Sequence, residues 1–488
     1  MTSSWVLGLL ALDLILFLAA VFLFDKSSSR EETLVLSALF FFSGMPALVY
    51  QIVWQRVLFS IYGVNAESVA VVVSAFMVGL GLGSLVGGRL SARFPRLGIV
   101  MFGGAELGVA VFGLCSLGIF RWAASHTAGA SLPLTVFFSL ALLILPTMLM
   151  GATLPLLTEH LVRHSGRVGY SMATLYFVNT FGSAVACYVC ASFLLREFGR
   201  SGSVTMAACL NTLVGATAFL YGRSKETGAA RAVSVVPEHA TEKPGMTIGA
   251  AMLIAGISGF IALGFEIAWF RVFSIASSDR APAFALLLST YLAGIAAGSY
   301  VTEKIMERRS AAAMVQAVGL LMVIAGGISA YLPPLVGRLM WRNVSFLASA
   351  PAFFLTAALL GSVLPLLCQL AVSADDQAGR GVSLVYVSNI AGSALGSLGI
   401  GFVLMQYFGL KQISLGLGLA GVVVGGAVLI FLGGKERKPP VWAYAVVIAA
   451  LAALPTASRM YPLLYERLIF GNRAEASEPF AHVVENRN

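Results

Sequence analysis

Long apolar runs, each about 20 residues, alternate with short polar stretches along almost the whole chain; a run of that length spans a bilayer as a helix. Helices also satisfy their own backbone hydrogen bonds in lipid. We therefore predict an all-α integral membrane protein with about fourteen spans. The spans are expected near 5–24, 34–56, 67–90, 97–120, 131–160, 170–195, 202–222, 247–270, 282–303, 312–334, 346–372, 381–406, 412–433 and 441–457.

Polar stretches divide this series of spans. Residues 1–33 are expected to form an extra N-terminal transmembrane helix and its loop. Six spans follow in 34–222, and a cytoplasmic linker at 223–245 separates them from six further spans in 246–433. An additional span is expected at 434–458 and a polar tail at 459–488. The first run has no basic segment before it and no small-residue cleavage site before Asp25, which favours a retained helix over a cleaved signal peptide. Asp13 in this run is expected to dock the helix onto the bundle.

The six-helix unit occurs twice. The motif Ser43-Gly44-x-x-Ala47-Leu48…Ile52-x-Trp54-x-Arg56-Val57 returns 215 residues later as Ser258-Gly259-x-x-Ala262-Leu263…Ile267-x-Trp269-x-Arg271-Val272. Two further blocks return after 210 residues, Gly151-x-x-Leu154-Pro155-Leu156-Leu157 at Gly361 and Tyr176-x-x-Asn179-x-x-Gly182-Ser183-Ala184 at Tyr386. Because six is an even number, the two copies share one orientation, which predicts parallel repeats about a pseudo-two-fold axis along the membrane normal.

The distribution of Lys and Arg predicts which ends of the spans face the cytoplasm. With the N-terminus outside, 18 of the 31 basic residues fall in inside loops and nine in outside loops and helix ends. The excess favours this orientation by the positive-inside rule. The inside set is Lys26, Arg30, Arg89, Arg93, Arg96, Arg163, Arg167, Arg223, Lys225, Arg231, Lys243, Lys304, Arg308, Arg309, Arg380, Lys435, Arg437 and Lys438.

Composition agrees with a membrane protein and excludes two other classes. Of the 488 residues, 58% are hydrophobic and only 11% charged, against about a quarter charged in soluble domains. The net charge of +9 comes from scattered basic residues rather than a basic groove, so no nucleic-acid partner is expected. Cys187 and Cys190 form a CxxC inside an apolar run, without the basic neighbours that activate a thiol, which favours helix packing over redox or metal chemistry.

One loop and several motifs resemble known families. The loop Gly88-Arg89-Leu90-Ser91-Ala92-Arg93-Phe94-Pro95-Arg96 resembles the G-x-L-A-D-R-x-G-R loop of the major facilitator transporters, with Ala92 in place of the acidic residue and Pro95 in place of the second glycine. The paired motifs together resemble the membrane domain of bacterial fused spermidine-synthase-like proteins. The resemblance covers about residues 34–433 and implies a major-facilitator-like bundle.

The tail adds to this resemblance. Residues 461–467 and 479–488 resemble the start of the synthase-like domain, whose catalytic sequence is not found within this chain. No G-x-G-x-x-G follows a predicted strand, so no cofactor and no catalytic residue are expected. The resemblance implies a soluble synthase-like domain or subunit, or other membrane subunits, as partners besides the lipid bilayer.

Ionisable groups within spans are costly and are therefore the first candidates for function. Glu266 precedes Arg271 by five residues, and its counterpart in the first repeat is Gln51. It is expected either to bind a cation or proton or to pair with Arg271 at a helix end. Glu106 lies mid-span and should be protonated or face a cavity or partner helix.

Other polar residues recur in both halves. Tyr176, Asn179, Tyr386 and Asn389 are expected either to line a central cavity or to form interhelical hydrogen bonds. Trp54 and Trp269, with Arg56 and Arg271, are expected to anchor helices at the outer interface. Pro155 and Pro365 should kink one helix in each half. Glu159 and His160 end a span on the inside, where solvation explains them.

Three functions remain open at this stage. The bundle could move a small solute such as a polyamine, serve as the membrane part of a synthase-like enzyme, or act as a non-transporting scaffold in a larger complex. We expect a multi-pass protein of a bacterial inner membrane in each case.

Overall fold

The computed structural model describes residues 30–62, 66–127, 132–229, 245–277, 281–306, 309–375, 377–432 and 441–473. Within these residues, 13 helices are long and apolar enough to cross a membrane, and each coincides with a predicted span. The predicted first span, with Asp13, and the predicted start of a synthase-like domain at 479–488 lie outside the described residues.

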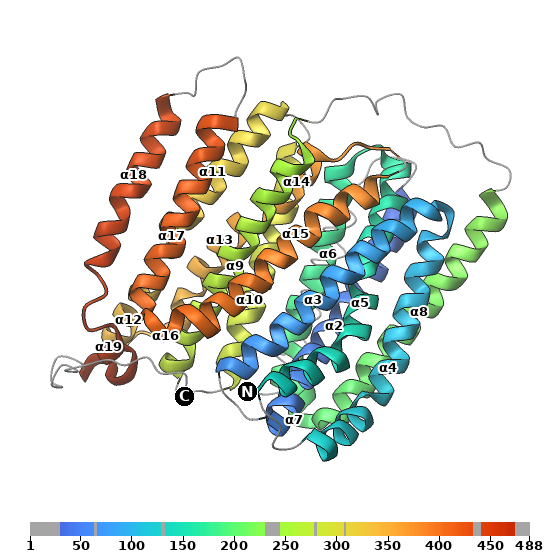
Figure 1. Cartoon of the computed structure of the whole chain (residues 1–488), viewed down its shortest axis with the longest axis horizontal. Helices are drawn as coiled ribbons and strands as arrows, with labels where there is room; N and C mark the ends of the chain where they lie inside the picture. Colours follow the sequence, from blue (N-terminus) through green and yellow to red (C-terminus); the bar gives the residue numbers. More distant parts are fainter. Residues whose placement is uncertain are drawn as a thin grey trace.

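The first repeat forms the right-hand part of the bundle in Figure 1. Its helices are α2 (Arg30–Tyr62), α3 (Ala66–Arg93), α4 (Gly98–Thr127), α5 (Leu132–Ser165), α6 (Val168–Val189) and α8 (Gly199–Ala229), with the short η1 (Pro95–Leu97) and the pair η2 (Cys190–Leu194) and α7 (Leu195–Glu197) between them. Helix α8 continues seven residues into the segment predicted as linker.

The second repeat forms the left-hand part. Its elements are α9 (Ile248–Ser277), α10 (Ala281–Met306), α11 (Ala311–Ser329), α12 (Leu332–Trp341), η3 (Phe346–Ser349), α13 (Ala350–Gly361), α14 (Val363–Ala371), α15 (Ala378–Leu398), η4 (Gly399–Leu404), α16 (Met405–Tyr407), α17 (Leu410–Ala427) and η5 (Val428–Leu432). A π-helical stretch follows α6 in one repeat and α15 in the other, so the duplication extends to local irregularities. The end of the bundle where α8 ends and α9 begins is called the linker side below.

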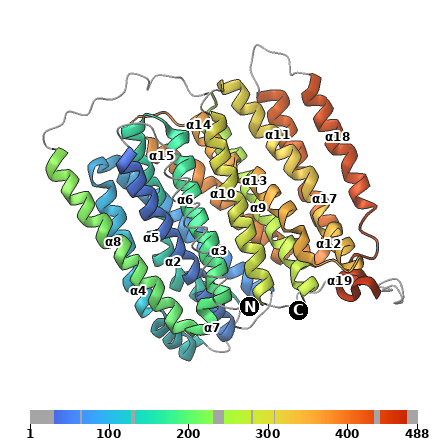
Figure 2. The same ribbon diagram turned by 180° about the vertical axis from the view of Figure 1, so that it is seen from behind.

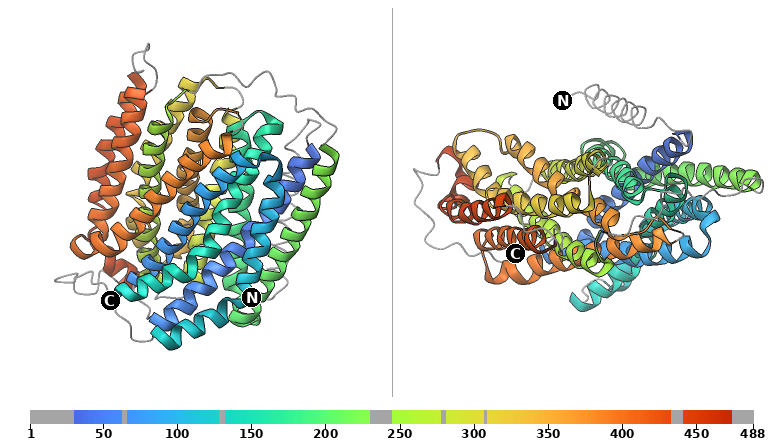
Figure 3. Two further views of the ribbon diagram at one scale, coloured as in Figure 1. Left: turned by 45° about the vertical axis from the view of Figure 1, so that its right-hand side comes forward. Right: turned by 90° about the horizontal axis from the view of Figure 1, so that it is seen from above.

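Two long helix pairs join the repeats. Helix α3 packs along α15, and α6 packs along α10, as Figures 1 and 2 show from opposite sides. Ser289 and Ser299 of α10 donate hydrogen bonds to the carbonyls of Ala184 and Ala173 on α6, both at 2.9 Å. The view from above in Figure 3 shows the two repeats side by side, meeting at these seams.

Two additional elements flank the second repeat. Helix α18 (Val441–Ser458) packs on α17 and α11, and the short α19 (Leu464–Phe470), followed by η6 (Gly471–Arg473), packs on α12. The prediction of a polar tail from 459 onward is wrong for its first part. Tyr461, Leu464 and Leu468 are buried, and Tyr461 donates its hydroxyl to Ala330 O at 2.9 Å. Apolar side chains in this segment have a helix surface within reach, so they pack on it.

The predicted interfacial position of the two tryptophans is wrong. Trp54 and Trp269 are fully buried inside their own repeats. Trp54 stacks on Tyr50 with ring centroids 4.8 Å apart, and Trp269 stacks on Phe265 at 5.4 Å. Each indole faces other helices of its repeat, where aromatic packing stabilises it more than a headgroup position would.

The arginines two positions later, Arg56 and Arg271, are partly exposed. Of the two prolines, Pro365 follows a break between α13 and α14, whereas α5 continues through Pro155. The CxxC cysteines are buried, and the Cys187 thiol donates to Ala285 O at 3.4 Å across the α6–α10 seam, as expected for packing residues.

Candidate functional site

A cavity of about 280 Å³ lies between the two repeats. Its wall is built from α2, α3, α4, α5, α6 and α8 of the first repeat and from α9, α10, α13, α14 and α15 of the second. All seven residues predicted from the sequence to bind a substrate or ion lie in this wall. They are Gln51, Glu106, Tyr176, Asn179, Glu266, Tyr386 and Asn389.

Glu106 is held in the wall by two hydrogen bonds. The surrounding helices bury Glu106, which is 3% exposed. Ser43 Oγ donates to one carboxylate oxygen at 2.6 Å, and the amide of Asn211 donates to the other. Ser43 belongs to the repeated motif, but its contact with Glu106 and the role of Asn211 were not predicted, because they depend on how α2, α4 and α8 cross.

The second repeat lacks this cluster. In the first repeat, α4 and α8 approach closely at Gly103 and Gly215, and the equivalent approach of α11 and α17 is at Gly319 and Gly425. The residues matching Glu106 and Asn211 by this alignment are Met322 and Gly421. The buried carboxylate cluster is therefore specific to the first repeat.

Glu266 lies in the opposite wall, on α9. Its side chain is only partly buried, and no hydrogen bond or ion pair joins it to another described residue. Tyr291, also in the wall, donates its hydroxyl to Ala262 O at 3.1 Å, one turn before Glu266. The amide of Gln51 occupies the equivalent position in the first repeat. The position of Glu266 in the cavity wall favours binding of a cation or proton over the alternative of a helix-end ion pair with Arg271.

The repeated asparagines are chiefly interhelical contacts. Asn179 Nδ2 donates to Phe40 O at 3.2 Å, and Asn389 Nδ2 donates to Ala255 O at 3.0 Å, so the same bond joins α6 to α2 and α15 to α9. This confirms the structural interpretation for the two amides. The phenol rings of Tyr176 and Tyr386 remain available in the cavity wall.

The electrostatic character of the cavity is one-sided. Its described wall contains two carboxylates, one from each repeat, and three tyrosines, but no lysine, arginine or histidine. Charges interact strongly in a site that excludes bulk water. The arrangement is therefore suited to a cation and unsuited to an anion.

The repeats also join each other on the linker side through a pair of matched hydrogen bonds. Glu159 Oε2 accepts from the backbone N–H of Gly379, and Gln369 Oε1 accepts from the N–H of Gly169, both at 2.6 Å. The two bonds are related by the 210-residue offset. Each satisfies an N–H in the first turn of a helix, α15 or α6, whose own N-cap side chain makes no such bond. We refer to these four residues as the linker-side clasp.

Glu159 was expected to be solvated, and this was wrong. Its side chain is 1% exposed, because α15 covers it, and its other oxygen accepts from Arg163 Nε at 3.0 Å. Sequence position alone placed Glu159 at a helix end. Only the packing of the two repeats showed that the end is covered by the other repeat.

No family model and no curated protein matches this chain. Solved structures do. The chain is similar to the major facilitator transporter FucP in its outward conformation, with a TM-score of 0.55 at 15% identity over 81% of this chain and 97% of that one. It is also similar to the E. coli proton:xylose symporter XylE, with a TM-score of 0.54 at 15% identity, covering 85% and 98%.

The chain has the major facilitator fold. At this identity the likeness concerns the fold alone, and it confirms the predicted arrangement of two parallel six-helix repeats. In this fold the cavity lies between the two repeats, as it does here. The protein is thus a multi-pass membrane protein with this fold.

Proposed function

We propose that this protein moves a small cationic solute, such as a polyamine, through the cavity between its repeats. The observation that carries the proposal is the pair of carboxylates in a wall that, as far as it is described, contains no basic side chain. A flexible diamine would place one ammonium group near each carboxylate. The tyrosine rings would add cation–π attraction.

The two carboxylates differ in how they are held in the cavity wall. Glu106 is oriented in advance by Ser43 and Asn211, so binding a cation there requires little reordering. Glu266 has no described partner and can turn toward the solute or take up a proton. The polyamine itself comes from the resemblance to the synthase-fused membrane proteins, and the charge pattern supports the broader class of amines.

Transport requires the clasp to open. In an alternating-access cycle the two repeats rock against each other around a fixed site. The clasp joins the repeats on the linker side, so its two hydrogen bonds must break when that side opens. A scaffold protein would not need a cavity of this volume, and this supports transport over the scaffold alternative.

We further propose a bacterial inner membrane location with the linker side in the cytoplasm and the N-terminus outside. The excess of basic residues in the linker-side loops supports this orientation. A soluble synthase-like domain or subunit remains our proposed partner, on the basis of the sequence resemblance; it would supply or consume the amine.

The test is amine flux in proteoliposomes. Wild-type protein should take up labelled putrescine or spermidine in preference to a neutral sugar of similar size. Glu266→Gln and Glu106→Gln should each reduce uptake at least tenfold, because each removes one countercharge for the ammonium groups. Glu197→Gln, a change at an exposed carboxylate outside the cavity, is the matched control and should leave uptake unchanged. Undiminished amine flux in both cavity variants would refute the proposal.

A further inference from the structure

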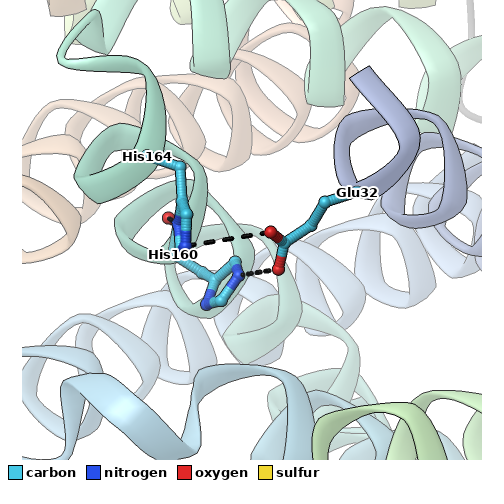
Figure 4. A group of neighbouring side chains, drawn as sticks. All are labelled: Glu32, His160 and His164. Atoms are coloured by element: carbon cyan, nitrogen blue, oxygen red, sulfur yellow. Dashed lines mark hydrogen bonds and ion pairs between the residues drawn. The ribbon is translucent and has the colours of Figure 1, made fainter. Parts of the chain in front are cut away.

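Three potential metal ligands converge on the linker side of the first repeat, outside the cavity (Figure 4). His160 and His164 are one turn apart near the end of α5, and Glu32 lies in the first turns of α2. Glu32 Oε1 is 2.9 Å from His160 Nε2, and Glu32 Oε2 is 3.8 Å from His164 Nε2. One ligand atom from each residue lies within 4.8 Å of the others.

These separations suit a small divalent metal ion. Two ligands bound at about 2.0–2.1 Å in a tetrahedral zinc site are about 3.3 Å apart. The two distances at Glu32, each to a different carboxylate oxygen, lie on either side of that value, and the three ligand atoms lie within 4.8 Å of one another, so side-chain rotation is needed to bring all three to one ion. Two histidines four residues apart on a helix, with a carboxylate from another element, are a recurrent donor set for Zn²⁺.

The orientation of His164 gives an independent indication. Its Nδ1 is 2.8 Å from the carbonyl oxygen of His160, and because a carbonyl can only accept, Nδ1 carries the proton. In the neutral ring, Nε2 then has a lone pair that faces the Glu32 carboxylate. A cation placed here would take one ligand atom from each of the two residues. A backbone carbonyl is one of the groups that commonly hold the other ring nitrogen of a metal-bound histidine.

The second repeat shows that the fold does not need this cluster. By the repeat offsets, Glu32, His160 and His164 correspond to Thr247, Leu370 and Ala374. Thr247 instead accepts from the N–H of Ala250 at the start of α9, and Leu370 is buried in the core. The same helix ends therefore pack with no ionisable group at any of the three positions.

We propose that Glu32, His160 and His164 form a binding site for one transition-metal ion of the Zn²⁺ type, with the remaining position open to water. His164 is 46% exposed and gives the ion a path from solvent, while His160 and Glu32 are 12% and 14% exposed. The ion would tie the start of α2 to the end of α5. Glu159 of the linker-side clasp is the sequence neighbour of His160 but contacts α15, whereas His160 contacts α2. The site does not depend on the proposed transport of amines.

The experiment is a zinc titration of the purified full-length protein with its affinity tag removed. Protein stripped with a chelator and dialysed is titrated with Zn²⁺ against a competing chelating dye, and bound zinc is counted by elemental analysis. Wild-type protein should retain one equivalent. Glu32→Gln and His164→Ala should each weaken binding at least about 100-fold, since even the loss of a supporting group costs up to that factor.

His126→Ala is the matched control, because His126 is an exposed histidine at the end of α4. It should bind zinc as the wild type does. The test uses His164→Ala rather than a change at His160 because His164 is about half exposed and its replacement is expected to leave the fold intact. The proposal is overturned if the wild type retains no zinc, in which case the cluster is an ion pair only, or if Glu32→Gln and His164→Ala bind as tightly as the control. Neither result depends on amine flux.

Discussion

Replacing Glu159 by alanine is expected to weaken the clasp that closes the linker side. The buried carboxylate joins α5 of the first repeat to the N–H of Gly379 at the start of α15, and it also pairs with Arg163. Alanine leaves that N–H without a partner whenever the linker side is closed. When the side is open, water can satisfy the N–H, so the substitution penalises the closed state alone.

The size of the effect follows from the geometry. A hydrogen bond to a charged group contributes about 1.5–3 kcal/mol, and the buried position of Glu159 favours the upper part of that range. A loss of about 2–3 kcal/mol would raise the ratio of open to closed molecules about 30- to 150-fold. Glu159→Gln keeps an acceptor oxygen, as Gln369 does in the other repeat, so we expect a change of only about fivefold.

Cysteine alkylation can measure this ratio. Ser91 is 1% exposed and lies against Gly379, so a cysteine at this position, with the native cysteines replaced by alanine, is covered in the closed state. Its rate of reaction with a maleimide should rise by the same 30- to 150-fold factor in Glu159→Ala, because the rate follows the population of open molecules. A cysteine at the exposed Ser224 should react at one rate in every background.

Equal alkylation rates in wild-type and Glu159→Ala protein would refute this account of the clasp. A fast rate already in the wild type would do so as well, since it would mean that the linker side is open in solution. An equally large increase in Glu159→Gln and Glu159→Ala would assign the stabilisation to the negative charge and its pairing with Arg163 rather than to the bond with Gly379.

Two further predictions use matched positions. Gly379→Ala should favour the open state and speed alkylation of the cysteine at position 91, because a Cβ at Gly379 would meet the Pro155 carbonyl oxygen and Glu159 Cβ at 2.9 Å. Its control is Gly104→Ala, where a Cβ would meet nothing within 4 Å. That variant should stabilise the protein by up to about 1 kcal/mol in thermal unfolding. Trp54→Phe should lower stability by about 1 kcal/mol more than Trp269→Phe, since Trp54 Nε1 donates to Ser116 at 3.0 Å while Trp269 Nε1 has no partner among the described residues. Comparable losses in the two variants would contradict this reasoning.

The repeat and the rule on charges within spans led to both carboxylates of the cavity wall. Glu266 and Gln51 were recognised because one repeat carries a carboxylate where the other carries an amide, and Glu106 because a charge within a span needs a partner or a cavity. All three line the cavity. Periodicity and intramembrane polarity are local properties of the chain, so they can be found without knowing how the helices pack.

Other residues could not be assigned in this way. Trp54 and Trp269 were placed at the membrane interface, because tryptophan is enriched there, but both fill the interiors of their repeats. The clasp partners of Glu159 and Gln369, the bonds that hold Glu106, and the approach of Glu32 to two histidines all join segments far apart in the chain.

The sequence by itself thus determined that the chain spans a membrane, where the spans lie within the described residues, that the six-helix unit is duplicated, and which charged residues line the cavity. These follow from hydrophobic length and from offsets along the chain. The tertiary structure decided which polar groups meet, and therefore which are held, which are available in the cavity and which close the linker side. The physical reason is that hydrogen bonds and ion pairs depend on distances of about 3 Å between atoms, and helix crossings set those distances.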